Sequence, residues 1–433
     1  MRYGRALIFL LPCLLWGIVC GIYASGELGL YLRLMFDWTG MLPSEFPLLD
    51  IHAPLAAIEC LHRGIDIYAY NPCDIDGRLG LYSPIFPYLV PGSWTTAQTV
   101  PLGIAADFIF FAALPVVLAP RSRTEFAIYA AGVCSSAVAY GVVQGNFDIL
   151  VFVLAALAGM LYRTGAASRW LCYAICFFAG LNKYYPMALL LLMVRETWYR
   201  ALAYGLIAAI LFGIFIDVYL RELSAIMAHG VPAGDYLLSN AISAHNLPYG
   251  LNQLGPRFVS LAAARGMFVL FAAAALAGAI AVARRGLLAL EWEQWGSPAA
   301  VFLIIGAILF TGSFFAGQNY YYRAVHLLFV LPGLLWFAGH MPRLRWLCHT
   351  TIGAILFLQW EGFLGQMLLH VLRPGAPRFV GWPAPRLGMW LVSQAVAWWI
   401  ASVLGAFLVA FVWRSPAVEG LRALLPGRLH RAA

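Results

Sequence analysis

The chain has 433 residues, of which 63% are hydrophobic and 11% are charged, and its formal net charge is +8 at pH 7. Ordinary soluble domains carry roughly twice this share of charged residues, so the composition excludes a soluble globular protein. The positive charge comes from arginines set between apolar runs, without a lysine-rich tail, and this distribution argues against a nucleic-acid partner.

Apolar runs of the length that an α-helix needs to cross a bilayer recur along the whole chain. Groups of arginines separate them, and the positive-inside rule places such groups in cytoplasmic turns. Two spans fit between successive groups, so the pattern predicts one all-α membrane domain over residues 1–433, with about twelve helices and both termini in the cytoplasm. The predicted spans are residues 6–24, 102–119, 125–143, 148–162, 170–181, 185–194, 201–220, 259–283, 298–316, 325–340, 347–370 and 389–413.

Some of these spans allow a second interpretation. Residues 148–162, 170–181 and 185–194 are short, and the last two could instead form a broken pair that dips into the membrane from the outer face. Residues 6–24 resemble a signal peptide, but their apolar core is long, so we expect an uncleaved first helix.

This topology leaves two long segments outside the cytoplasm, residues 25–101 and residues 221–258. Cys60 and Cys73 both fall in the first segment, where an oxidising exterior would allow a disulfide. Shorter outer pieces surround Gly145–Asp148, Asn182–Pro186, Gly317–Arg323 and Arg373–Arg386.

The first outer segment holds the main candidate for a catalytic carboxylate, Asp50. An apolar stripe predicts a short amphipathic helix along the membrane surface directly after this residue. The stripe consists of Ile51, Leu55, Ile58 and Leu61. Asp50 could simply cap this helix by accepting backbone N–H bonds. Alternatively it is a general base, with a pKa that rises above about 4 where lipid or protein desolvates it.

Lys183 is the only lysine in the chain, and it lies between two apolar runs at a predicted outer turn. It could be an interfacial residue whose stem covers apolar surface, although arginine has that place elsewhere in this chain. An ionisable group near membrane depth is also a functional candidate, and a compact ammonium suits phosphate. With Arg323 it predicts a clamp for a lipid-linked phosphate. His326, one turn further on, could join this site or be a packed core histidine.

Other acidic residues are weaker candidates. Asp66 lies in Gly64-Ile-Asp-Ile-Tyr, which is also typical of a turn that enters a short strand. Asp74 and Asp76 form an Asp-x-Asp among turn-forming residues, so we interpret them as part of a turn. No recognisable ligand cluster appears, so neither a metal nor a cofactor is predicted.

The motifs occur in an order that resembles the membrane glycosyltransferases of family 87, in the GT-C superfamily, typified by polyprenol-phosphate-mannose-dependent mannosyltransferases. The resemblance covers roughly residues 1–200, with a weaker echo at Gly317–Arg323. Its motifs are Asp50 after the first span, Gly64-Ile-Asp66-Ile-Tyr68, Tyr82-Ser83-Pro84 with Pro87, Gly145-Asn146, and Asn182-Lys183-Tyr184-Tyr185-Pro186.

The resemblance implies a GT-C-type bundle with short amphipathic helices in its extracytoplasmic loop, in the plasma (inner) membrane. It implies transfer of a mannose-like hexose from a polyprenyl-phosphate donor to a glycan or glycolipid acceptor, with inversion, by a monomer. Asp50 would be the general base, and Lys183, Arg323 and His326 would bind the donor phosphate. The residues expected to bind substrate are Asp66, Tyr68, Tyr82, Asn146, Tyr185, Gln318, Tyr321, His245 and Asn246.

Two other classes of protein stay open at this point. A transporter or flippase would need paired halves and charges that converge at mid-membrane, whereas the acidic residues inside the predicted spans are few, chiefly Asp107, Asp217 and Glu361. An oligosaccharide ligase or polymerase would rely on outer arginines and a histidine, so a decisive role for Arg257 or His245 would favour it. His245 and Asn246 could also be ordinary turn residues of a structured loop.

Overall fold

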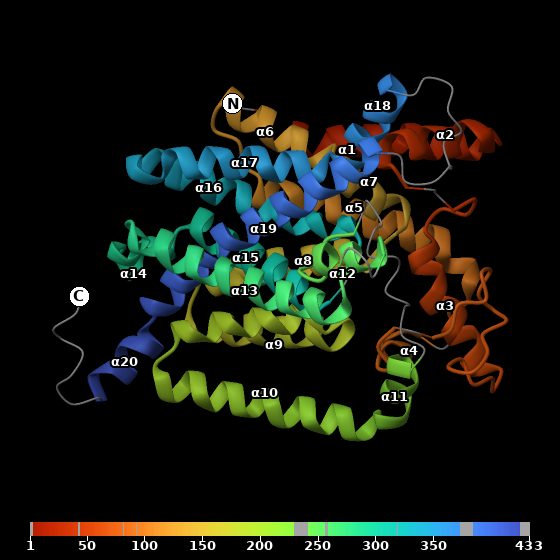
Figure 1. Cartoon of the computed structure of the whole chain (residues 1–433). Coiled ribbons are helices and arrows are strands. Elements are labelled where there is room, and N and C mark those ends of the chain that lie inside the picture. Colours follow the sequence, from red (N-terminus) through yellow and green to blue (C-terminus); the bar gives the residue numbers. More distant parts are fainter. Residues whose placement is uncertain are drawn as a thin grey trace.

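The computed structural model describes residues 3–41, 44–80, 82–91, 93–228, 241–255, 259–317, 319–372 and 384–424. Within these ranges every regular element is a helix, and the single β-type contact is an antiparallel bridge between Ala241 and Tyr320. The long helices run alongside one another in a bundle, with α3, α4 and α11 gathered at one end and α14 and α20 at the other (Figure 1).

The first half of the chain, up to residue 228, supplies the elements on which most of the candidate site is built. They are α1 (Gly4–Ala24), α2 (Leu28–Thr39), α3 (Leu49–His62), α4 (Phe86–Leu89), the 3₁₀ helix η1 (Thr96–Gln98), α5 (Thr99–Val117), α6 (Arg123–Val133), α7 (Ser136–Val143), α8 (Phe147–Tyr162), α9 (Ala166–Lys183), the 3₁₀ helix η2 (Tyr185–Arg195), α10 (Trp198–Val218) and α11 (Leu220–Ala228).

The second half completes the bundle. Its elements are α12 (Asn246–Gln253), α13 (Leu261–Arg284), η3 (Leu287–Ala289), α14 (Trp292–Trp295), α15 (Pro298–Ala316), the 3₁₀ helix η4 (Tyr321–Phe329), α16 (Val330–His340), η5 (Pro342–Leu344), α17 (Arg345–Gln359), α18 (Glu361–Leu372), α19 (Ala384–Trp413) and α20 (Pro416–Leu424).

Seven helices of the described ranges are long and apolar enough to cross a membrane, or up to nine if each of two bent pairs counts as one span. Helix length and hydropathy therefore make the chain a multi-pass membrane protein. The seven are Gly4–Ala24, Thr96–Val117, Trp198–Val218, Leu261–Arg284, Pro298–Ala316, Tyr321–His340 and Pro385–Trp413, and the bent pairs are Arg123–Val133 with Ser136–Val143 and Pro342–Gln359 with Glu361–Leu372.

All twelve predicted spans coincide with helical residues, but the structure supports seven to nine as membrane-crossing segments. The other three, predicted at 148–162, 170–181 and 185–194, correspond to α8, α9 and η2. Helices α8 and η2 are apolar but short, and α9 is long enough but less apolar than the rest. Twelve crossings therefore stays a prediction.

Burial separates the centre of the bundle from its lipid-facing periphery. In the most apolar stretch of α15, 78% of the residues are buried, whereas the figure is 11% for both α10 and α13. A helix that is apolar on all sides yet exposed in the protein is suited to hydrocarbon as its solvent. We infer that α15 is the central helix and that α10 and α13 face lipid.

Helices α9 and η2 form a hairpin. They pack along each other and meet at Tyr184, and at their far ends Arg169 Nε lies 2.6 Å from Glu196 Oε1. The structure thus brings the predicted spans 170–181 and 185–194 together as a pair. Its second arm is a 3₁₀ helix of 11 residues, and η4 is another of 9, although such runs seldom exceed 3–4 residues.

Helix α3 corrects one expectation about the first outer segment. A helix does follow the start of this segment at Leu49–His62, but it is buried on most sides and not only along one stripe. Even His52, opposite the predicted stripe, is buried and contacts Thr99 at 3.3 Å. Packing against α5, η1 and α4 buries sides that an amphipathic helix would leave exposed, while its position along the membrane surface stays a prediction.

The contact between α15 and α16 depends on Gly333. A Cβ atom added there would lie 2.4 Å from Leu303 Cβ and 2.7 Å from the Ala299 carbonyl oxygen. We expect Gly333→Ala to lower the free energy of unfolding by about 1–3 kcal/mol, because overpacking forces the helices apart. Thermal melting of the purified protein measures this. Gly353→Ala in α17 is the control, since an added Cβ meets no atom within 4 Å, and equal melting temperatures for the two variants would contradict the close contact.

Candidate functional site

Asp50 lies in the first turn of α3, but it does not cap the helix. The N-cap residue is Leu48, which has a positive φ of 62° and makes no side-chain cap. The backbone N–H groups of Leu48 and Asp50 donate instead to the carbonyls of Val143 (2.8 Å) and Gln144 (2.9 Å). The start of α3 is therefore bonded to the turn between α7 and α8, and the Asp50 carboxylate is available for other contacts.

Gly145 makes that turn possible. Its φ is +59°, a left-handed conformation that side chains disfavour, and an added Cβ would lie 2.8 Å from Ile51 Cγ1. The next residue, Asn146, is the N-cap of α8, where its Oδ1 accepts from the Asp148 backbone N–H at 2.9 Å. The Gly-Asn pair thus brings the start of α8 close to the start of α3 and fixes the position of the Asn146 side chain.

The Asn146 side chain links Asp50 to Lys183. Its Nδ2 donates to Asp50 Oδ2 at 2.5 Å, and its Oδ1 accepts from Lys183 Nζ at 2.9 Å. A carboxylate only accepts and an ammonium only donates, so the two partners fix the orientation of the amide. One side-chain amide therefore separates the predicted base from the predicted phosphate ligand.

Asp148 is the centre of the cations. Its side chain is 1% exposed, and its Oδ2 lies 3.0 Å from Lys183 Nζ and 3.5 Å from Arg323 Nε. Its Oδ1 accepts from the Tyr185 hydroxyl at 2.5 Å. A buried carboxylate requires such partners, so Asp148 holds both predicted phosphate-binding cations at one point of the structure.

Helix η4 places Arg323 and His326 on one face. A 3₁₀ helix has three residues per turn, so side chains three apart lie directly above each other. His326 Nε2 lies 2.6 Å from the Tyr185 hydroxyl, which already donates to Asp148, so this nitrogen carries the proton. The Arg323 guanidinium also lies over the Tyr185 ring, 4.7 Å from its centroid. His326 is thus buried and part of the site through Tyr185.

Lys183 is the last residue of α9, and the backbone turns sharply after it. Tyr184 has φ 58° and ψ −53°, and among the described residues it and Leu48 are the two non-glycine residues with positive φ. Each such residue costs about 1–3 kcal/mol and persists where the surroundings impose it, often at functional sites. One precedes Asp50 by two positions and the other directly follows Lys183.

Arg78 brings a third cation to the site. One guanidinium nitrogen lies 3.7 Å from Asp50 Oδ1, while another lies 2.9 Å from Asp74 Oδ2. Asp74 also accepts from the backbone N–H groups of Asp76 and Arg78, as the turn interpretation of Asp-x-Asp predicts. Burial works to raise the pKa of Asp74, but the Arg78 guanidinium and these N–H groups bring it below its ordinary value.

The pKa of the Asp50 carboxyl is shifted in the opposite direction to that of Asp74. Burial raises the pKa of the Asp50 carboxyl above its ordinary value, although Lys183, Asn146 and Arg78 act to lower it. The side chain is still 21% exposed, so a substrate can reach it. The charged groups of the cluster balance as three carboxylates against three cations, namely Asp50, Asp74 and Asp148 against Arg78, Lys183 and Arg323.

The other predicted substrate residues divide into two groups. Tyr82 joins the cluster, since its hydroxyl donates to the Asp50 carbonyl at 3.2 Å. Asp66 instead pairs with Arg221 at 2.9 Å, and Tyr68 packs beside the Cys60–Cys73 disulfide that the structure contains.

Three predicted residues have structural contacts away from the cluster, and one is not described. Tyr321 donates to the Thr39 carbonyl at 2.6 Å, and His245 stacks on Phe268 with ring centroids 4.6 Å apart. Asn246 is buried, and its Oδ1 accepts from the Ser243 hydroxyl at 3.0 Å. Gln318 lies outside the described residues.

Sequence reasoning missed three members of the cluster, Asp148, Arg78 and Tyr322. The Tyr322 ring lies beneath Lys183 Nζ, 5.6 Å from the ammonium to the ring centroid. A signal for Asp148 was present, because an acidic residue two positions after Asn146 stands at the start of an apolar helix. Arg78 carries no comparable signal, since it lies in a polar loop.

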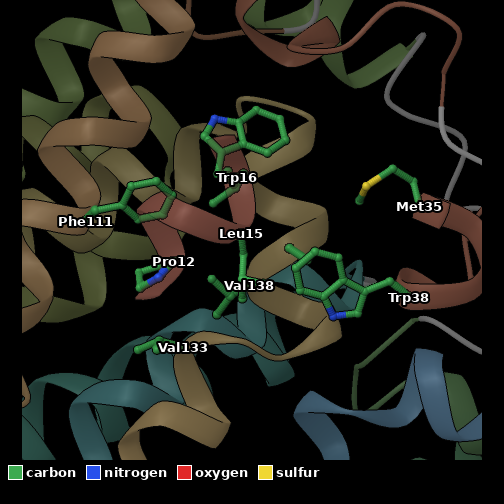
Figure 2. A pocket seen from close by; sticks show the side chains of 10 residues that line it. Pro12, Leu15, Trp16, Met35, Trp38, Phe111, Val133 and Val138 are labelled. Carbon is green, nitrogen blue, oxygen red and sulfur yellow. The ribbon is translucent and has the colours of Figure 1, made fainter. Parts of the chain in front are cut away.

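A small apolar groove of about 20 Å³ lies between helices of the first half of the chain (Figure 2). Helices α1, α2, α5, α6 and α7 supply its lining, which is Pro12, Leu15, Trp16, Met35, Trp38, Phe111, Val133, Val138, Ala139 and Val142. Val142 directly precedes Val143, whose carbonyl accepts from Leu48. The groove therefore reaches the same turn that carries Asn146.

The described residues contain no group of three or more His, Cys, Asp or Glu side chains that could hold a metal ion. No family model, curated protein or solved structure matches this chain.

Changing Asn146 to Asp tests its role as the link. The variant keeps the acceptor for Lys183 but sets a second carboxylate against Asp50, so the two repel unless they share a proton. We expect the variant to melt well below the wild type at pH 8 and closer to it at pH 5, where a shared proton restores the contact. Melting temperatures of the variant and the wild type, measured against pH, give this difference. A melting-temperature difference that does not change with pH would contradict the contact between residue 146 and Asp50.

Proposed function

We propose that this protein is a GT-C-type membrane glycosyltransferase that moves a mannose-like hexose from a polyprenyl-phosphate donor to an extracytoplasmic acceptor, with inversion. One observation carries the proposal: the Asn146 amide joins the Asp50 carboxylate to Lys183, whose ammonium shares Asp148 with Arg323. A base and a cation pair on a single hydrogen-bonded path are what an attack at the anomeric carbon of a lipid phosphate sugar requires.

The charge of the cation pair supports a phosphodiester donor. Lys183 and Arg323 contribute two positive charges, and Asp148 contributes one negative charge. These three side chains together carry one positive charge, opposite to the single negative charge of a polyprenyl-phosphate sugar, while the Asp50 carboxylate balances that charge across the whole cluster. The cations are already desolvated and held in place, so they need little rearrangement as negative charge builds on the departing phosphate.

Asp50 would supply the base. The acceptor hydroxyl oxygen attacks the anomeric carbon, the bond from that carbon to the phosphate oxygen breaks, and the phosphate leaves with the electron pair. The hydroxyl proton passes to Asp50, whose raised pKa makes it a better base than an ordinary carboxylate. The leaving group needs no protonation, so a second carboxylic acid is unnecessary.

The surroundings of the site support its placement outside the cytoplasm. The Cys60–Cys73 disulfide ties the end of α3 to the loop that carries Asp74, and disulfides persist in oxidising compartments. In the proposed orientation the plasma (inner) membrane holds about twelve spans with both termini in the cytoplasm. The isoprenoid tail of the donor would lie in a groove between helices, at the boundary with lipid.

Replacing Asp50 by Asn removes the base while keeping the size of the side chain. We expect transfer from a radiolabelled polyprenyl-phosphate sugar to fall by about 10²–10⁴-fold, with donor binding retained. The assay compares membranes with wild-type and variant protein over a panel of donor sugars. Asp37→Asn is the matched control, because Asp37 is 46% exposed on α2 and pairs with Arg33. Full activity of Asp50→Asn would remove the base assignment.

Replacing Lys183 by Gln tests the phosphate site. Loss of a charge-assisted contact should raise the donor concentration for half-maximal rate by about 10- to 100-fold. Arg33→Gln, which removes an exposed positive charge on α2, should leave this concentration unchanged. A lysine with only a structural role would lower stability but leave the donor dependence of the remaining folded enzyme intact.

A further inference from the structure

A large cavity lies at the other end of the helices that begin at the Asp50 cluster. Its volume is about 500 Å³, and its lining includes the ends of α5 (Val117), α8 (Met160) and α16 (Gly339). The opposite ends of these helices lie at the cluster. Helix α5 begins at Thr99, which contacts His52 of α3, and helix α8 has Asn146 as its N-cap. Helix α16 follows directly after η4, which carries Arg323. The cavity and the cluster therefore occupy opposite ends of the bundle.

Three arginines from three separate segments line this cavity: Arg5, Arg121 and Arg163. Among the described residues none of them forms an ion pair with a carboxylate. The one acidic residue in the lining is Glu125, and its Oε2 accepts from the Arg121 backbone N–H at 2.6 Å. The carboxylate thus serves the start of α6, and the lining keeps an excess of positive charge.

A histidine adds a further polar atom. His340 stacks on Trp336, with ring centroids 4.4 Å apart, and its Nδ1 lies 2.8 Å from the Trp336 carbonyl oxygen. A carbonyl only accepts, so Nδ1 carries the proton, and Nε2 of the neutral ring can accept from a donor in the cavity. Both residues belong to the lining of the cavity.

The remaining walls are mostly apolar. Phe302, Pro332 and Leu335 line the cavity, while Val116 (41% exposed) and Met160 (43% exposed) stand at the surface of the helices. A site with unpaired arginines above apolar walls matches a ligand with a phosphate head and an acyl chain. A free anion would need the arginines but gain nothing from the walls.

We propose that this cavity binds the phosphodiester headgroup of an anionic phospholipid, with Arg5, Arg121 and Arg163 around the phosphate and the apolar walls along the first part of the acyl chains. In the predicted topology these arginines face the cytoplasmic leaflet, which is rich in anionic lipid. The inference does not depend on the proposed transferase activity.

The test is a lipid titration of the full chain by native mass spectrometry, with phosphatidylglycerol and phosphatidylcholine as probes. We expect the wild type to retain phosphatidylglycerol in preference, and Arg121→Gln with Arg163→Gln to weaken its binding about fivefold per arginine removed. Arg163→Lys should keep most of the binding because the charge stays. Arg343→Gln is the control, an exposed arginine at the same end that does not line the cavity.

Melting temperatures in phosphatidylcholine show whether the variants are folded before they are titrated. Unchanged phosphatidylglycerol binding by the folded double variant would overturn the proposal. Binding of inorganic phosphate or soluble glycerophosphoglycerol to the wild type as tightly as phosphatidylglycerol would overturn the lipid as occupant, because the apolar walls would then contribute nothing to binding.

Discussion

Asp148 is a carboxylate buried in an apolar bundle, and such a group is stable there only with cations and donors around it. Lys183 comes from the end of α9, Tyr185 from the start of η2 and Arg323 from η4, and all three contact this one side chain. The need to satisfy Asp148 therefore draws together segments that are about 140 residues apart in the chain. Asn146, two residues earlier, extends the same network to Asp50.

The network also explains why the site combines order with access. Asp148 is fully enclosed, whereas Asp50 and Arg323 are each 21% exposed. The buried part fixes positions, and the exposed part can meet a ligand. An anionic ligand at Lys183 and Arg323 would share these cations with Asp148 and would not have to assemble them, which is the general advantage of a preorganised charged site.

Much of the helical framework could be predicted from the sequence, because apolar runs and arginine punctuation report directly on membrane helices. Assigning successive apolar runs to alternate directions across the membrane also predicts that Asp50 and Lys183 lie at the same end of the bundle. Individual partners could not be predicted: nothing near Arg78 in the sequence indicates Asp50, and the stacking of His245 on Phe268 depends on tertiary packing. The sequence predicts Tyr321 as the substrate residue. Neighbours in a 3₁₀ helix point in different directions, however, and it is the Tyr322 ring that lies beneath Lys183.

The 3₁₀ geometry of η2 has a consequence for the thickness that a short segment can cover. A 3₁₀ helix rises about 2.0 Å per residue, so the 11 residues of η2 extend about 22 Å. An α-helix would use about 15 residues for the same height. An estimate of length that assumes the α-helical rise per residue is therefore too short for such a segment. A 3₁₀ helix lets the chain cover more of the bilayer thickness with fewer residues.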